Sequence, residues 1–189
     1  PQLTDDHVPH RPLVAATAKP WTGEIAVRRS PAADGFEVVT TFGGRARLET
    51  LAADLFPSPV SRFDLGNALI VDLVHDTLQS VTDLALFSGA NAIAVESAPG
   101  VWEIPQAGHA ELLAPGRYRL TRFLRGQRGT EDAMGAPAPA NARVVVLDTA
   151  VATLPIGEAD LGLPWNWRIG PASRPPSDAT MVARTFTPE

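Results

Sequence analysis

The sequence predicts a mainly β protein, an antiparallel β-sandwich or barrel with short helical turns and extended Pro-rich arms. Three observations lead to this class. Short apolar segments recur between turn signals, and several of them alternate apolar and polar residues, as strands with one buried face do. The 18 Pro and 15 Gly residues leave little room for long helices. This spacing leaves barrel and sandwich open.

We expect three regions along the chain. Residues 1–20 and 172–189 are rich in proline and show no apolar period, so each is expected to be an extended arm or linker. Residues 21–171 carry the apolar segments and are expected to form one β-rich domain. The chain does not begin with Met, which leads us to expect a piece of a longer polypeptide.

Several strands can be expected from alternation alone. Residues 24–28 and 36–40 alternate and are expected to pair as a hairpin. Residues 68–74 also alternate, whereas 143–147 is a continuous apolar run, which is typical of a strand buried on both faces. Residues 158–162 are expected to form a single helical turn that ends at its glycine.

Residues 92–124 contain two Pro-Gly pairs, beginning at Pro99 and Pro115, which favour tight turns because Pro presets φ and Gly accepts a positive φ. The segment is therefore expected to be a three-stranded meander. Pro105 lies inside its middle strand and removes a backbone donor, which indicates an edge or a bulge there. Residues 47–55 fit either a two-turn helix or a strand followed by a turn.

Composition excludes several function classes. The absence of Cys removes a disulfide scaffold, a thiolate metal site and a cysteine nucleophile. The net charge of −5 argues against dedicated or sequence-specific nucleic-acid binding, which needs a basic surface. No run of about 18 apolar residues occurs, so we expect no membrane insertion by this segment.

We expect no enzyme, and no catalytic, cofactor-binding or metal-binding residues. The chain lacks a serine nucleophile elbow, a Walker loop and a zinc-protease helix motif. His7 and His10 carry metal-ligand side chains, but a proline-rich terminal segment offers no rigid frame for an ion. Glu96 and Glu103 can be drawn as a carboxylate pair, yet nothing in the sequence supplies the apolar pocket that a catalytic acid needs.

The segment at residues 124–131, Leu-Arg-Gly-Gln-Arg-Gly-Thr-Glu, predicts a strand that runs into a tight glycine loop. Its threonine is expected to cap a following helical turn. Five arginines fall within residues 117–128, and we favour structural or protein-interface roles for them over an anion patch. The interface or motif candidates in this region are Arg125, Gly126, Arg128, Gly129 and Thr130.

Trp165 and Trp167 are expected to lie on one face of a strand, because side chains two residues apart share a face. Such a pair can serve as a sugar-stacking platform, as an interface anchor or as part of the core. The sequence leaves these three roles open.

Four segments carry a resemblance to a known family. They read Ser-Gly-Ala-Asn at 88–91, Gly-Val-Trp-Glu-Ile-Pro-Gln at 100–106, Ala-Pro-Gly-Arg-Tyr-Arg-Leu at 114–120, and the loop at 124–131. Weaker support comes from 62–69, 161–163 and 168–171. In this order they resemble a segment of the tail-tip protein, also called the baseplate hub or megatron, of gene transfer agents and related siphophage-like tails. Asn91 and Trp102 lie in these segments and are further candidates.

The resemblance implies a structural virion component built of β-rich domains. Such hubs are trimers at the distal tail tip that close the tail channel and guide DNA across a bacterial envelope. The implied partners are other copies of the chain and neighbouring tail or baseplate proteins, with synthesis in the bacterial cytoplasm. The alternative is an extracellular carbohydrate-binding β-sandwich module that stacks sugar on Trp165 and Trp167.

Overall fold

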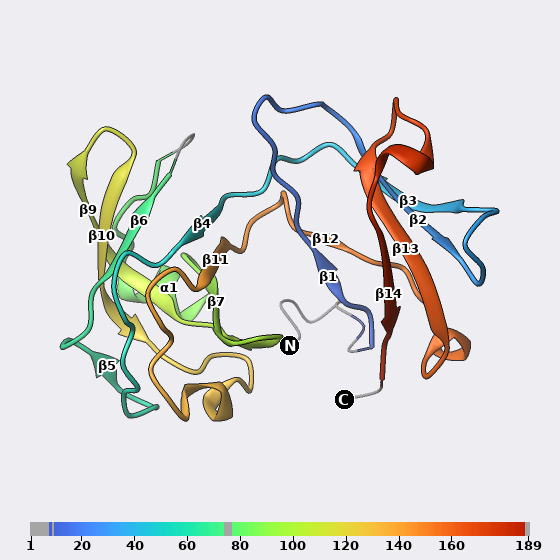
Figure 1. Cartoon of the computed structure of the whole chain (residues 1–189). Helices are drawn as coiled ribbons and strands as arrows, with labels where there is room; N and C mark the ends of the chain where they lie inside the picture. Colours follow the sequence, from blue (N-terminus) through green and yellow to red (C-terminus); the bar gives the residue numbers. More distant parts are fainter. Residues whose placement is uncertain (1–7, 9, 74–76, 188–189) are drawn as a thin grey trace. The chain divides into compact units, whose positions relative to one another are not determined.

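The computed structural model of the chain describes residues 8, 10–73 and 77–187. Strands make up 40% of the chain and helical turns 9%, and all strand pairs are antiparallel, which confirms the mainly β class (Figure 1). None of the helices in the described part of the chain has the length and apolar character needed to cross a bilayer.

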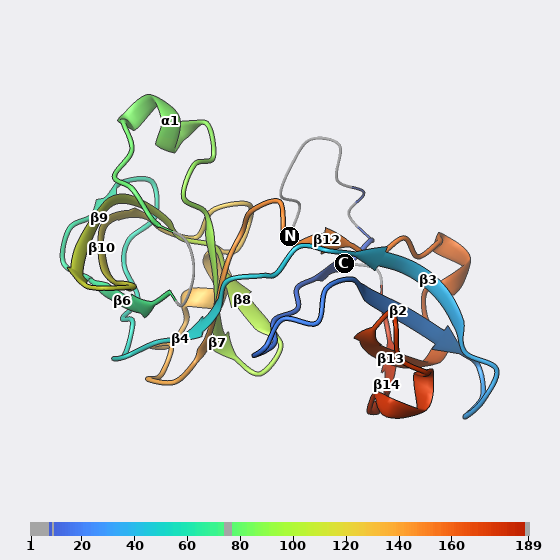
Figure 2. The same ribbon diagram turned by 90° about the horizontal axis from the view of Figure 1, so that it is seen from above.

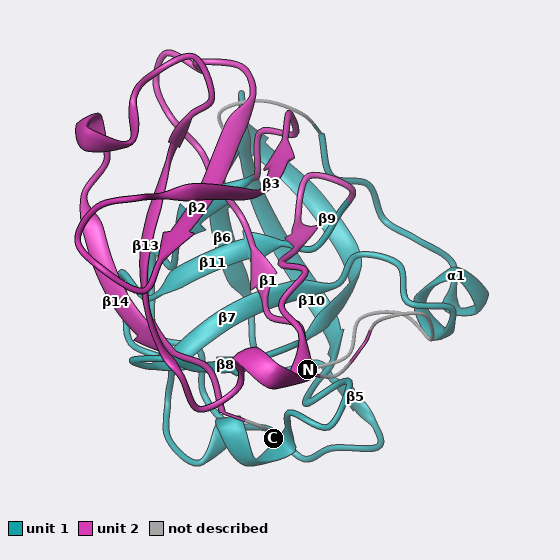
Figure 3. Ribbon diagram, turned by 90° about the vertical axis from the view of Figure 1, so that its right-hand side faces the viewer, with its two compact units in different colours: residues 1, 47–148 teal, residues 2–46, 149–189 magenta. Residues whose placement is uncertain are grey.

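The chain divides into two compact units (Figure 3). Unit 1 is formed by Arg47–Asp148, and unit 2 by Gln2–Ala46 together with Thr149–Glu189. Unit 1 therefore interrupts the sequence of unit 2. This division differs from the single domain expected over residues 21–171, because strands that are far apart in the sequence pair with each other in unit 2.

The first sheet of unit 1 is centred on β10 (Arg117–Leu124). One side of β10 pairs with β9 (Gln106–Ala114) through a hairpin. The other side pairs first with β6 (Leu69–Asp72) and then with β5 (Phe63–Asp64), which meet successive parts of the same strand. In Figure 2, β6, β9 and β10 form a curved layer at the left.

The second sheet of unit 1 contains four strands in the order β4-β11-β7-β8. They are β4 (Leu48–Thr50), β7 (Ile93–Ala98), β8 (Val101–Glu103) and β11 (Arg143–Val146). Strand β11 is buried at Val144, Val145 and Val146, as its continuous apolar run predicts. Residues 47–55 form a strand and a turn, so the helical alternative for this segment is wrong.

The expected three-stranded meander over residues 92–124 is wrong at its middle. Strands β8 and β9 belong to different sheets, so the chain crosses from one sheet to the other at Pro105. The Pro105 carbonyl accepts a hydrogen bond from the backbone N–H of Ile93 at 3.0 Å. Proline cannot donate to a ladder, and here it marks the place where the strand ends instead of a bulge within it.

The two sheets of unit 1 enclose one apolar core. Its fully buried members come from both sheets and from the segment after β4. They include Leu51, Leu69, Val71, Ile93, Val95, Leu120, Phe123 and Val144. All residues of this core lie within Arg47–Asp148, so unit 1 buries its own apolar surface.

Helical structure in the described residues is short. The elements are α1 (Asp83–Phe87), η1 (Glu131–Met134), η2 (Glu158–Asp160) and η3 (Pro176–Asp178). The single turn expected at residues 158–162 is confirmed as η2. It is followed by Gly162 with φ of 76°, a left-handed conformation that favours glycine.

Unit 2 contains a four-stranded sheet in the order β14-β13-β2-β3 and a separate two-stranded pair, β1-β12. The strands are β1 (Leu13–Val14), β2 (Ile25–Ser30), β3 (Glu37–Phe42), β12 (Ala152–Thr153), β13 (Pro164–Pro171) and β14 (Met181–Thr185). The hairpin expected at 24–28 and 36–40 is confirmed as β2 and β3. Val27, Leu154, Ile156 and Trp167 form the core of this unit.

Parts of both segments expected as extended arms are strands that pair with the rest of unit 2. In the N-terminal segment, Leu13–Val14 pairs with Ala152–Thr153, whereas residues 1–7 and 9 lie outside the described residues. In the C-terminal segment, β14 pairs with β13 along five residues. Arg28 and Arg168 donate hydrogen bonds to backbone carbonyls of the loop at residues 172–179, and these bonds hold the loop against the sheet.

We predict that Arg47–Asp148 folds when it is produced alone. All residues of its apolar core belong to this segment. Its first and last residues are joined by the Arg47 Nη2–Asp148 Oδ2 ion pair at 2.7 Å. The excised segment should show a β-type circular dichroism spectrum and one cooperative urea transition. As a control, residues 52–148 lack β4 and Leu51 and should be unfolded. An unfolded 47–148 segment would contradict the proposed autonomy of unit 1.

Candidate functional site

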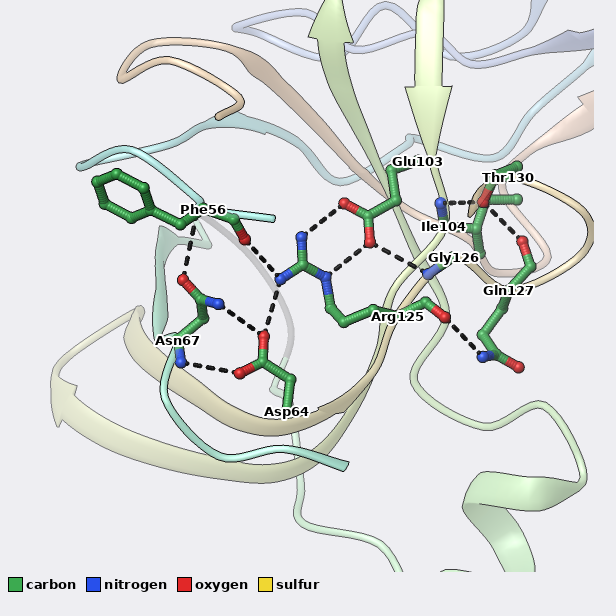
Figure 4. A network of polar contacts seen from close by, with 9 residues as sticks. All are labelled: Phe56, Asp64, Asn67, Glu103, Ile104, Arg125, Gly126, Gln127 and Thr130. Carbon is green, nitrogen blue, oxygen red and sulfur yellow. Dashed lines mark hydrogen bonds and ion pairs between the residues drawn. The ribbon is translucent and has the colours of Figure 1, made fainter. Parts of the chain in front are cut away.

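The most distinctive side-chain arrangement in unit 1 is a buried ionic corner formed by Asp64, Glu103 and Arg125 (Figure 4). Arg125 follows β10, Asp64 ends β5 and Glu103 ends β8. Because β8 belongs to the other sheet, the corner ties the two sheets together. The side chains of Arg125, Glu103 and Asp64 are only 1%, 2% and 4% exposed.

Arg125 uses its planar guanidinium to hold both carboxylates at once. Its Nε donates to Glu103 Oε1 at 2.6 Å, and its Nη2 donates to Glu103 Oε2 at 2.8 Å, which is the bidentate arrangement that arginine favours. Its Nη1 donates to Asp64 Oδ2 at 2.8 Å and to the Phe56 carbonyl at 3.0 Å. The guanidinium thus fastens three chain segments.

Asp64 is also held by the turn that follows it. Its Oδ1 accepts the backbone N–H groups of Gly66 at 3.0 Å and Asn67 at 3.1 Å, and its Oδ2 accepts the Asn67 side-chain amide at 2.7 Å. The Asn67 Oδ1 in turn accepts the backbone N–H of Phe56 at 3.2 Å. This short-range bonding is typical of aspartate at a turn, and it fixes the carboxylate that faces Arg125.

For Asp64 and Arg125, hydrogen bonds and neighbouring charges outweigh the effect of burial on the pKa. Burial opposes ionisation of the Asp64 carboxyl, but hydrogen bonds from Asn67, Arg125 and Gly66 together hold its pKa below its ordinary value of 3.8. Burial likewise disfavours the charged guanidinium of Arg125. The hydrogen bonds and charges of Glu103 and Asp64 overcome that effect and raise the pKa of Arg125.

The glycine loop after Arg125 completes the corner. Gly126 has φ of 59°, and a Cβ there would lie 3.0 Å from Glu131 Cα and from Met134 Cε, so only glycine fits. Its backbone N–H donates to Glu103 Oε1 at 3.2 Å. Gly129 has φ of 72° and is exposed, so its conformation alone favours glycine.

Thr130 occupies the expected cap position before η1, but its hydroxyl makes no capping hydrogen bond to that helix. The Oγ1 instead accepts the backbone N–H of Ile104 at 2.9 Å and donates to the Gln127 carbonyl at 2.7 Å. The Gln127 N–H also donates to the Ile104 carbonyl at 2.8 Å. Thr130 therefore joins the loop to the residue that follows β8.

The remaining candidates of unit 1 differ in exposure. Arg125, an interface or motif candidate, is 2% exposed, and its guanidinium is occupied inside the corner and not at the surface. Arg128 is exposed. Asn91 donates from its amide to the carbonyls of Gln79 at 2.8 Å and Ala107 at 3.0 Å, which is a backbone-bracing role. Trp102 is partly buried, with the Arg143 guanidinium 5.4 Å from its ring.

The structure does not present Trp165 and Trp167 as an exposed pair. Trp167 is 5% exposed and packs in the core of unit 2, 5.7 Å from the Phe186 ring. The Arg29 guanidinium lies over the Trp165 ring at 4.3 Å and also contacts Asp160 at 2.7 Å. Of the three roles left open by the sequence, part of the core is the one that this packing matches.

Most of the arginine run makes ion pairs within unit 1. Arg122 binds both oxygens of Asp83, at 2.6 and 3.0 Å, and its guanidinium lies 3.8 Å from the centre of the Phe63 ring. Arg117 contacts Asp72 at 3.5 Å and Arg119 contacts Glu111 at 3.9 Å. These contacts fit the structural role favoured from the sequence.

Each carboxylate oxygen of Asp64 and Glu103 accepts at least one hydrogen bond. Glu96, the other member of the pair drawn from the sequence, binds Arg143 instead, at 2.5 and 2.6 Å. In the described residues, no group of three or more His, Asp or Glu side chains is arranged to hold a metal ion.

The sequence reasoning missed Asp64 and Glu103 as partners of Arg125. The local pattern gave no signal, since Asp64 and Glu103 each stand between two apolar residues. In a strand such alternation by itself predicts a charge on the exposed face. What the sequence could not show is which of 21 acidic residues would meet this one arginine.

The fold and the corner together define a mainly antiparallel β protein whose two-sheet unit is closed by buried ion pairs. The model of the Rcc01698-like, C-terminal family matches residues 46–145. The chain belongs to this family, and the match coincides with unit 1 almost residue for residue. A search of curated proteins finds no match.

We predict that Arg125→Met destabilises the protein by about 3–5 kcal/mol, because it leaves two buried carboxylates without their cation. Arg125→Lys should recover only part of this loss, since an ammonium group cannot reproduce the bidentate pair. The control is Arg119→Met, at an exposed ion pair, with an expected change within about 1 kcal/mol. Urea unfolding measures all three; equal effects at positions 125 and 119 would refute the assigned role.

We predict that the free energy of unfolding falls as the pH drops below about 4, and that Asp64 carries part of this fall. A carboxylate whose folded pKa is depressed contributes stability that is fully present above its unfolded pKa of 3.8 and is lost as the pH falls through its folded pKa. Asp64→Asn should be less stable at pH 7 and should lose less stability between pH 4 and pH 2.5. An unchanged pH slope in urea titrations would count against this assignment.

Proposed function

We propose that this chain is a structural segment of a virion-like tail-tip protein, at the baseplate hub of a tail related to those of gene transfer agents and siphophages. In this role it supplies rigid shape and interface area, and no bond is made or broken on it. The full-length protein would take part in tail assembly and in DNA delivery across a bacterial envelope.

The first support is the position of the resemblance. The four segments that carry it span residues 88–131 and all lie inside unit 1, which is also the part that the family model matches. The weaker segment at 62–69 lies there too and contains Asp64 of the ionic corner. One module therefore contains most of the residues that resemble the hub.

The observation that carries the proposal is that polar side chains of these segments hydrogen-bond to the backbone and to one another. Gln106 donates to the carbonyls of Leu86 and Ala90, at 2.8 and 3.0 Å, and Asn91 braces two further carbonyls. Arg125 and Thr130 tie the ends of strands together. Polar groups that are hydrogen-bonded to backbone and to one another suit a scaffold, because a general acid or base needs an atom free to meet substrate.

The proposed partners are other copies of the chain, as a trimer in the full-length assembly, and neighbouring tail or baseplate proteins. The proposed location is the distal tail tip of a virion-like particle. The sugar-stacking platform of the carbohydrate-binding alternative lacks support, because Trp167 is buried and the Arg29 guanidinium lies over Trp165.

Gold labelling of assembled particles tests this function. A peptide tag placed in the exposed turn at Gly100 should bring gold to the distal end of tails in negative-stain images of particles from the encoding bacterium. A tag on the major capsid protein provides the matched control, with gold on the head. Label distributed over the head, or found only on unassembled protein, would overturn the proposal.

A further inference from the structure

The four-stranded sheet of unit 2 has two bare edges. Strands β14 and β3 lie at the ends of the order β14-β13-β2-β3, and each pairs on one side only (Figure 1). No backbone hydrogen bond between described residues covers the outer side of either strand. Backbone donors and acceptors on such an edge are a template for a further strand.

Unit 1 treats its edges differently. The outer side of β9 is covered by Ser80, whose Oγ accepts the Ala110 N–H at 3.0 Å, and by Val81, whose N–H donates to the Gly108 carbonyl at 3.0 Å. The end of β8 is covered by Gln127 and Thr130. Bonds from neighbouring loops thus cover part of the β9 edge and the residue after β8, whereas no backbone bond among the described residues covers the outer side of β14 or β3.

Several side chains on the two edge strands are both apolar and exposed. All five residues of β14 are exposed, with Met181 at 41% and Val182 at 50%. On β3, Val38 is 56% exposed. Neither strand carries a lysine or a proline; each carries one charged residue, and β3 pairs with β2 through one bulge.

The two edges complement each other in direction and in charge. Each strand in the order β14-β13-β2-β3 is antiparallel to the next, so β3 and β14 run in opposite directions. A second copy that continues the sheet would therefore meet the first with antiparallel strands. Glu37 is the charged residue of β3 and Arg184 is that of β14, so the two edges attract each other, whereas two β14 edges would repel.

We propose that copies of this chain join edge to edge, with β14 of one copy adding as an antiparallel neighbour to β3 of the next. In this register Glu37 lies opposite Arg184 of the partner subunit, and Val38 lies opposite the partner's Ala183. The contact is head to tail, so it builds a ring or a filament and not a two-fold dimer. This contact specifies how the self-association in the proposed function would occur. It is argued from the sheet edges alone and can be tested on the purified chain, without assembled particles.

Cysteine cross-linking of the full 189-residue chain tests the contact directly, because the chain has no Cys. Glu37→Cys and Arg184→Cys variants are mixed and oxidised mildly. The two positions within one copy are three strand spacings apart, roughly 14 Å, which is beyond the roughly 7 Å limit for a disulfide. A cross-linked dimer in the mixture therefore reports contact between copies.

The expected result is a dimer in the mixture, little dimer in either variant alone, and a ladder of larger species when both cysteines are in one chain. Asp132→Cys mixed with Arg184→Cys provides the collision control, since Asp132 is exposed in unit 1. Absence of a dimer above this control would overturn the proposal. Efficient cross-linking of Arg184→Cys with itself would also overturn it, in favour of two-fold pairing of β14.

Charge reversal provides a second, independent measurement. Glu37→Arg and Arg184→Glu should each weaken self-association about threefold in sedimentation experiments, and the double variant should restore it. Thermal midpoints equal to that of the unmodified chain show that the variants are folded. Unchanged association in all three variants would reject the edge contact, while gold at a tail tip could still support the proposed function; the two ideas can fail separately.

Discussion

The structure of unit 1 depends on one buried arginine. Arg125 leaves the central strand of one sheet and binds Glu103 of the other sheet and Asp64 beside its own. An unpaired charge at this depth would be strongly destabilising, so the three segments must arrive together for the corner to form. The corner thereby sets the place where β10 ends, where β8 ends and where the loop at 124–131 folds back. The hydrophobic core supplies the driving force for collapse, and the corner selects which strand ends meet.

Arginine has the same fastening role elsewhere in the chain, where all but one of the 16 basic residues are arginine. Arg28 and Arg168 hold the loop at 172–179 by its carbonyls, and Arg29 joins Asp160 while covering the Trp165 ring. A guanidinium suits this work because its five donors lie in one plane and reach several acceptors at once. The chain has few long helices or strands to order its loops, and these contacts order them instead.

The two units distribute their roles differently. Unit 1 closes its core, covers the edges of β8 and β9 and contains the segments that carry the family match. Unit 2 is formed by the segments that precede and follow unit 1 in the sequence. Both edge strands of its sheet are paired on one side only. Closed packing and unpaired backbone groups are thus kept in separate units, as the proposed contact between copies requires.

By itself, the sequence determined the fold class, the hairpin of β2 and β3, the buried run of β11 and the glycine loop after β10. These follow from local rules: alternation, continuous apolar runs, and the positive φ that only glycine accepts easily. The tertiary structure alone decided that Pro105 moves the chain between sheets, that Arg125 is buried among Asp64 and Glu103, and that both termini of the described chain belong to one unit. The physical reason is separation along the sequence. These features bring together residues that are far apart in the chain, and a local pattern does not specify which distant residue a charge or a strand edge will contact.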